Sequence, residues 1–181
     1  MKRPEFVNEV ILPQGVEAQV DGKTVKVKGP KGEVTKTLLS KTVAFEKVDN
    51  KILLKSEDSA KNFKRIVNTF RSHINGMVEG VTKGFVYKLK VCSGHFPMTI
   101  KIEKDKILIN NFLGEKIPRV SKILEGAKVT QNGDVIIVEG IDLANVSQTA
   151  ANLEIAVRIR NRDRRRFQDG IYLTEKAGVP I

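Results

Sequence analysis

The chain has 181 residues, a net charge of +11 and a hydrophobic content of 40%. This length allows one large or two small domains, and the hydrophobic content excludes wholesale disorder. The charge favours a polyanionic partner, which is RNA, DNA or an anionic membrane. No apolar run approaches the roughly 20 residues that span a bilayer or forms a signal peptide. We therefore expect a soluble, cytoplasmic protein.

The first half of the chain predicts short strands followed by one helix. Apolar alternation and turn-forming dipeptides predict strands at 10–12, 16–20, 24–28, 34–39, 43–48 and 52–55. Apolar residues then recur at spacings of three and four from Phe63 to Val78, which predicts an amphipathic helix. Asp58 or Ser59 is its predicted N-cap, and Gly80 is its predicted end. The opposite, basic face of this helix is interpreted as solvated.

The second half repeats this order. Strands are predicted at 85–91, 98–102, 107–109 and 134–138, the last preceded by a hairpin turn at Asn132-Gly133. Pro118 marks a stretch that we predict to be irregular. A second helix is predicted from Leu143, with Asp142 as its N-cap. Its predicted apolar stripe is Val146, Ala150, Leu153 and Val157.

The two halves align with each other. With shifts of 82 and 83 residues, turns, strands and the helix stripe of the first half fall on those of the second, for example Ile52 on Val135. Recurrence of these elements in one order indicates an internal duplication. We expect an α+β fold of two tandem similar domains, residues 1–82 and 83–181. Each is predicted to be a small, mostly antiparallel sheet packed against one amphipathic helix.

The segment 158–173 concentrates six arginines beside Phe167 and Tyr172. Arginine binds phosphate in a bidentate manner and stacks on bases, so this cluster in a basic chain indicates a nucleic-acid surface. The segment follows an apolar-periodic helix and runs into the alternating sequence FQDGIYL. We therefore expect a folded element to position the arginines, and a solvated charged tail is the alternative.

The sequence offers little for catalysis or cofactor binding. It contains no phosphate-binding glycine motif, and the glycine-rich turn 29–32 is interpreted as structural. The two histidines, His73 and His95, have no metal-ligand spacing. The single Cys92 excludes an internal disulfide and a cysteine-based zinc cluster. We expect no cofactor, no metal and no enzymatic activity.

Several segments together resemble one protein family. They are TVKVKGPKGEV, VTKGFVYKLKV with SGHFPMT, INNFLGEKIPRV, QTAAN and RDRRRFQDGIYL. This set is similar to the large-subunit ribosomal protein family L six, in its archaeal and eukaryotic form, and covers nearly the whole chain. The motif RxFxDGIY at 165–172 is its most specific part. Cys92-Ser93-Gly94 departs from the aromatic residue and serine that relatives often carry there.

The resemblance implies a cytoplasmic, structural and non-enzymatic component of the large ribosomal subunit. It implies binding to large-subunit ribosomal RNA, mainly through the second domain, near the region where translational GTPases act. Neighbouring ribosomal proteins are further implied partners, and a membrane is not. By this resemblance and from the arginine segment itself, the expected RNA-binding residues are His95, Lys116, Arg119, Gln148, Asn152, Arg158, Arg160, Arg162, Arg164, Arg165, Arg166, Phe167 and Lys176. Lys176 and the tail 177–181 are expected to order only on RNA.

Two other functions stay open from the sequence. One is an RNA-modifying or hydrolytic enzyme that uses a carboxylate such as Asp163 or Asp169, which the absence of a nucleophile or cofactor motif disfavours. The other is a membrane-surface adaptor, which is disfavoured because no apolar insertion face accompanies the arginines. A turnover assay on bound RNA and a vesicle-binding assay after RNase treatment separate these functions.

Overall fold

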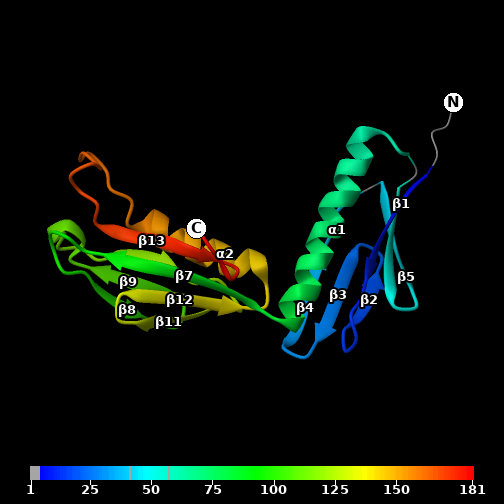
Figure 1. The fold of residues 1–181 in the computed structure, drawn as a ribbon, viewed down its shortest axis with the longest axis horizontal. Coiled ribbons are helices and arrows are strands. Elements are labelled where there is room, and N and C mark those ends of the chain that lie inside the picture. The colour runs from blue at the N-terminus through cyan, green and yellow to red at the C-terminus, as the bar shows by residue number, and fades with distance from the viewer. Residues whose placement is uncertain (1–4, 41, 57) are drawn as a thin grey trace. The chain divides into compact units, whose positions relative to one another are not determined.

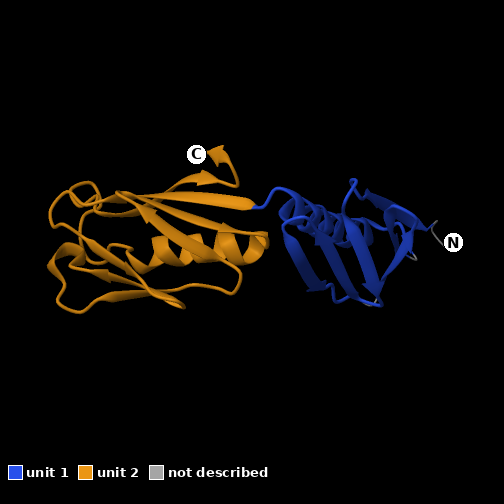
Figure 2. Cartoon of the chain, turned by 90° about the horizontal axis from the view of Figure 1, so that it is seen from below, with its two compact units in different colours: residues 1–84 blue, residues 85–181 orange. Residues whose placement is uncertain are grey.

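The computed structural model describes residues 5–40, 42–56 and 58–181, and the basic start of the chain lies outside them. The chain divides into two compact units, residues 1–84 and 85–181 (Figure 2). Each unit contains one α-helix and antiparallel sheets, which confirms the predicted α+β class with tandem similar domains. Each unit has two sheets where the sequence pattern predicted one. No described helix is long and apolar enough to cross a membrane.

Unit 1 packs two three-stranded antiparallel sheets with one helix (Figure 1). The strand orders are β1-β6-β5 and β2-β3-β4. The elements are β1 (Phe6–Ile11), β2 (Glu17–Asp21), β3 (Thr24–Gly29), β4 (Gly32–Thr37), β5 (Val43–Val48), β6 (Lys51–Ser56) and α1 (Lys61–Thr82). Helix α1 contacts β1, β3, β4 and β6. Alternate residues of β3 and β6 form the core, where Val25 and Ile52 are fully buried.

Helix α1 differs from its prediction at both ends. Its N-cap is Ala60, without a side-chain cap, and the Asp58 carboxylate accepts from the Ala60 amide at 3.0 Å. The predicted N-cap at Asp58 or Ser59 is therefore wrong. The helix also continues through the buried Gly80 and ends before Gly84, whose φ is +77°. The predicted end at Gly80 is wrong because Gly84 supplies the left-handed conformation that terminates helices.

Unit 2 combines a five-stranded sheet, β11-β12-β7-β13-β14, with a three-stranded sheet, β10-β9-β8, and the helix α2. The elements are β7 (Phe85–Cys92), β8 (Thr99–Ile102), β9 (Lys106–Asn110), the 3-10 turn η1 (Phe112–Gly114), β10 (Arg119–Lys122), β11 (Lys128–Asn132), β12 (Val135–Gly140), α2 (Leu143–Ala156), β13 (Gly170–Lys176) and β14 (Val179–Pro180). Asp142 caps α2 by accepting from the Ala144 amide at 3.1 Å, as predicted. The whole predicted stripe of α2 is buried.

Two segments of unit 2 differ from their predictions. The stretch after Pro118, predicted to be irregular, contains β10, which pairs with β9. The tail after Lys176 forms a hairpin in which Lys176 pairs with Val179, and the Ile181 amide donates to the Thr174 carbonyl at 3.0 Å. The expectation that this tail orders only on RNA is wrong, because these backbone hydrogen bonds are made within the protein.

The two units share one topology. The arrangement β1-β6-β5, with α1 after β6, corresponds to β7-β12-β11, with α2 after β12. The buried residues Ile52 and Leu54 of β6 correspond to the buried residues Ile136 and Val138 of β12. For this strand the structural register is therefore one residue longer than the predicted 83, which placed Ile52 on Val135, whereas the buried helix pair Val67 and Ala150 keeps the shift of 83. A slip of one residue exchanges the two faces of a strand. Unit 2 differs by adding β13 beside β7, and β14 beyond it.

Candidate nucleic-acid interface

Three loops of unit 2 lie at one end of its sheets (Figure 1). They are the loop 93–98 after β7, the loop 111–118 after β9, and the segment 157–169 between α2 and β13, which we call the arginine loop. The Asn111 side chain donates to the Pro97 carbonyl at 3.0 Å. The Phe96 ring lies 3.6 Å from where a Cβ on Gly114 would stand. The first two loops are therefore packed on each other.

Asp169, at the end of the arginine loop, fastens this loop to the loop after β7. Its side chain is 1% exposed. One carboxylate oxygen accepts from the backbone amides of Gly94 and His95, the latter at 2.9 Å, and the other lies 2.6 Å from His95 Nδ1. Burial by itself raises the pKa of Asp169, but the hydrogen bonds from His95 and Gly94 outweigh burial and lower the pKa. Asp169 is therefore an ionised clamp between the two loops.

Three side chains form a layered cluster beside this clamp, which we call the His95 stack. The ring centroids of His95 and Phe167 are 4.9 Å apart, and the Arg162 guanidinium carbon lies 4.9 Å from the centre of the Phe167 ring. The His95 side chain is 44% exposed. Aromatic rings and guanidinium planes are surfaces on which unpaired nucleobases stack. The structure thus brings together three of the residues expected to bind RNA.

Asp163 shapes the turn of the arginine loop. Its side chain accepts from the Arg165 backbone amide and pairs with the Arg165 guanidinium, both at 3.0 Å. Hydrogen bonds from Arg165 lower the pKa of Asp163. The Arg165 side chain is 91% exposed, so phosphate competes readily for it. Across the described part of the chain, the other five arginines of the segment 158–166 have no ion-pair partner: Arg158, Arg160, Arg162, Arg164 and Arg166.

Arg119 is engaged within the protein. Its guanidinium donates to both Glu115 oxygens at 2.8 and 2.6 Å, and to the carbonyls of Ala156 and Arg158 at 3.0 Å each. It also lies 4.3 Å from the centre of the Phe112 ring. The hydrogen bond from Arg119 lowers the pKa of Glu115. Because Ala156 ends α2, Arg119 fixes the direction in which the arginine loop leaves the helix.

The remaining expected residues lie at different places. Gln148 and Asn152 lie on α2, where Gln148 Nε2 donates to Asn152 Oδ1 at 2.9 Å and Asn152 Nδ2 donates to the Lys122 carbonyl at 3.4 Å. This pair therefore connects α2 to β10. Lys116 is exposed in the loop after β9. Lys176 ends β13, whose other end joins the arginine loop, so the structure does not bring Lys176 to the His95 stack.

Sequence reasoning missed the structural roles of Asp163 and Asp169, which it weighed only as carboxylates of an enzyme. The spacing of Asp163 before Arg165 is a usable signal, because aspartate often bonds a backbone amide two residues on. No such signal links Asp169 to His95, which lies 74 residues earlier. Over residues 5–40, 42–56 and 58–181, no group of three or more His, Cys, Asp or Glu is placed to hold a metal ion.

Topology and site define a duplicated α+β protein whose second unit carries, in addition, the arginine loop and the two strands β13 and β14. The chain belongs to the ribosomal protein L6 family, because the sequence model of this family matches residues 12–84 and 96–170. This confirms the resemblance found in the sequence. The chain is similar to large ribosomal subunit protein uL6 of Aeropyrum pernix, with 44% identity over 97% of each chain. It is also similar to uL6 of Methanobrevibacter smithii, with 44% identity over 93% of this chain and 94% of the relative.

Proposed function

We propose that this protein is a cytoplasmic, structural component of the large ribosomal subunit. We propose further that it binds large-subunit ribosomal RNA, mainly through the arginine loop and the His95 stack of unit 2. Membership of the family and the names of the relatives support the ribosomal placement. The observation that carries RNA binding is the arginine loop itself, in which five arginines have no ion-pair partner among the described residues and which contributes Arg162 and Phe167 to the partly exposed His95 stack.

The mechanism follows from these groups. Guanidinium groups neutralise phosphates and release counterions, which makes affinity fall with salt. A-form RNA hides its base edges in a narrow major groove, so recognition rests on shape, phosphates, 2′-hydroxyls and unpaired bases. The clamp of Asp169 on His95 fixes the stack before RNA arrives. A preorganised surface loses less conformational entropy on binding.

The family resemblance extends this proposal to neighbouring ribosomal proteins and to a position near the translational GTPases. The alternative enzyme is disfavoured by the state of its two carboxylates. Asp163 is paired with Arg165, and Asp169 accepts three hydrogen bonds from Gly94 and His95. A general base needs a free lone pair within reach of the proton that it removes. We therefore propose that the protein has no enzymatic activity.

Binding of the full chain to purified large-subunit ribosomal RNA tests the proposal. We expect tighter binding to this RNA than to an unrelated RNA of equal length, with affinity that falls steeply with salt. Equal affinity for both RNAs would contradict a specific ribosomal role. Gel electrophoresis and mass spectrometry of the recovered RNA are expected to show no cleavage and no added group. Cleavage or modification of the RNA by the wild type that is lost in Asp163→Asn or Asp169→Asn would show instead that the protein is an enzyme.

The internal contacts of Arg119 predict that it positions the arginine loop and does not bind phosphate. We expect Arg119→Met to lower the free energy of unfolding by about 1–3 kcal/mol, because the Ala156 and Arg158 carbonyls lose their donor. RNA affinity falls, but the slope of log affinity against log salt stays unchanged. Lys116→Met is the matched control: it flattens the slope by about 0.7–0.9 and leaves unfolding unchanged. A slope flattened by Arg119→Met would instead assign Arg119 a direct phosphate contact.

A further inference from the structure

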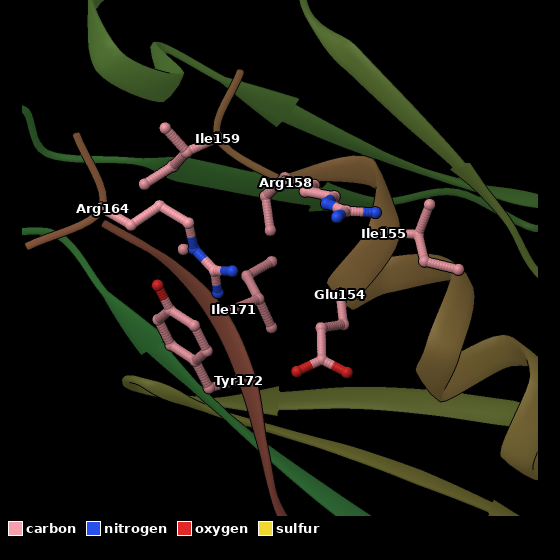
Figure 3. Close-up of a pocket in the computed structure, with 9 residues that line it drawn as sticks. Glu154, Ile155, Arg158, Ile159, Arg164, Ile171 and Tyr172 are labelled. Carbon is pink, nitrogen blue, oxygen red and sulfur yellow. The ribbon is translucent and has the colours of Figure 1, made fainter. Parts of the chain in front are cut away.

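A cleft of about 260 Å³ lies between the end of α2, the arginine loop and β13 (Figure 3). Its floor is apolar, since Ile171 and Val157 line it and are 1% and 3% exposed. Ile155 lines its rim and is 61% exposed. The Arg164 guanidinium enters from the arginine loop and the Glu154 carboxylate from α2. Arg158 lines the cleft as well, so the cleft combines an apolar floor with two guanidinium groups and one carboxylate.

Glu154 and the two arginines share the cleft without forming an ion pair among the described residues. Over the part of the chain that the structure describes, neither Glu154 nor Arg164 has an ion-pair partner. Tyr172 forms part of the wall, and its hydroxyl donates to the Gln168 carbonyl at 3.1 Å, which holds the ring in place. Space is therefore left between a cation and an anion over a fixed apolar surface.

The charges and the apolar floor of the cleft favour one chemical group of an RNA molecule over the others. A phosphate suits Arg158 and Arg164 but is repelled by Glu154, and it gains nothing from the floor at Ile171. A nucleobase has two apolar faces and a polar edge. Guanidinium planes stack on such faces, and a carboxylate accepts from an exocyclic amino group. An unstacked base therefore satisfies all three surfaces of the cleft at once.

We propose that this cleft receives one unstacked nucleobase of the bound RNA, with its face against Arg164 and its amino-bearing edge toward Glu154. This inference rests on the proposed RNA-binding function and adds a base preference to it. Cytosine presents an amino group where uracil presents a carbonyl oxygen, and a carboxylate repels that oxygen. The cleft thus discriminates against uracil by repulsion as well as by a missing bond.

Isoleucine methyl NMR on the full chain tests the cleft. The methyl groups of Ile155, Ile159 and Ile171 report on the cleft, and that of Ile74, buried in unit 1, is the internal control. The probes are single-stranded hexacytidine and hexauridine. We expect the cleft methyls to shift with both, at a half-saturating concentration about fivefold or more lower for hexacytidine. The Ile74 methyl is expected not to shift.

Two variants at exposed positions of the cleft sharpen the test. Glu154→Gln is expected to abolish the preference for hexacytidine, because an amide both donates and accepts. Arg164→Lys is expected to weaken the binding of both oligonucleotides, because lysine keeps the positive charge but lacks the planar guanidinium group that stacks on a base. Equal half-saturation by the two oligonucleotides in the wild type, or cleft methyls that do not shift, would overturn the proposal. Binding of purified large-subunit RNA is measured separately, so a chain that binds this RNA without cleft shifts refutes the cleft alone.

Discussion

Changing Arg164, Arg165 and Arg166 together to alanine is expected to weaken binding to large-subunit ribosomal RNA by about tenfold to a hundredfold at physiological salt. Among the residues that the structure describes, Arg164 and Arg166 have no ion-pair partner, and Arg165 has only the exposed pair with Asp163. Such a pair contributes little and yields to phosphate. Each lost phosphate contact flattens the slope of log affinity against log salt by roughly 0.7–0.9, so two or three contacts flatten it by about 2.

A matched variant separates the arginine loop from net charge. Changing Lys61, Lys64 and Arg65 to alanine removes the same charge from the exposed face of α1 in unit 1. We expect this variant to keep a nearly unchanged slope and most of the affinity. Both are measured by filter binding across a salt series. Equal losses in the two variants would show that overall charge dominates, and no loss in the arginine variant would make its loop a solvated segment.

Asp169→Ala is expected to lower the free energy of unfolding by about 3–5 kcal/mol and to weaken RNA binding at the same time. The change leaves the Gly94 and His95 amides and His95 Nδ1 without the acceptor that holds them in the wild type. His95 is then free to leave Phe167. Asp163→Ala is the control in the same loop, and because Asp163 is exposed this change is expected to leave the free energy of unfolding nearly unchanged. Similar unfolding of both variants in urea would show that the buried clamp contributes nothing.

The pH dependence gives the clamp a second readout. The pKa of Asp169 lies below its ordinary value of 3.8 in the folded protein. A carboxylate with a lowered pKa contributes stability that is present above its unfolded pKa and is lost as pH falls through the folded pKa. The difference in free energy of unfolding between wild type and Asp169→Asn is therefore expected to shrink below about pH 4. A difference that is constant from pH 7 to pH 3 would contradict an ionised clamp.

The sequence predicted those helices and strands in which the buried residues recur at the regular spacing of a helix or a strand. The stripe of α2 is buried at every predicted position because a single helix face meets the sheets. The same logic failed for β10, where Ser121 is 2% exposed and Val120 is 58% exposed. The buried Ser121 hydroxyl has no hydrogen-bond partner among the described residues. A strand with its polar residue inside and its apolar residue outside gives no alternation signal, so the stretch after Pro118 was predicted to be irregular.

Prediction of the candidate nucleic-acid interface from the sequence has the same limit. The arginine loop was identified from composition, because six arginines within a few residues need no spatial information. The clamp by Asp169 and the internal role of Arg119 depend on residues that are distant in sequence: Arg119 bonds a carbonyl 37 residues away. Hydrogen-bond partners of this kind are set by the fold, and no local pattern predicts them.

The insertion of β13 beside β7 also sets an order of events during synthesis. Asp169 and Gly94, which the clamp joins, are 75 positions apart in the sequence. The strand β7 is therefore synthesised long before β13, which pairs with its second edge. Until then β7 has one unpaired edge, whereas unit 1 already holds all the strands of its own two sheets. Non-local pairing is the slow part of folding. We therefore expect the surface that we propose for RNA to be the last part of the protein to mature, with the arginines reaching their final arrangement only after the rest of unit 2 is complete.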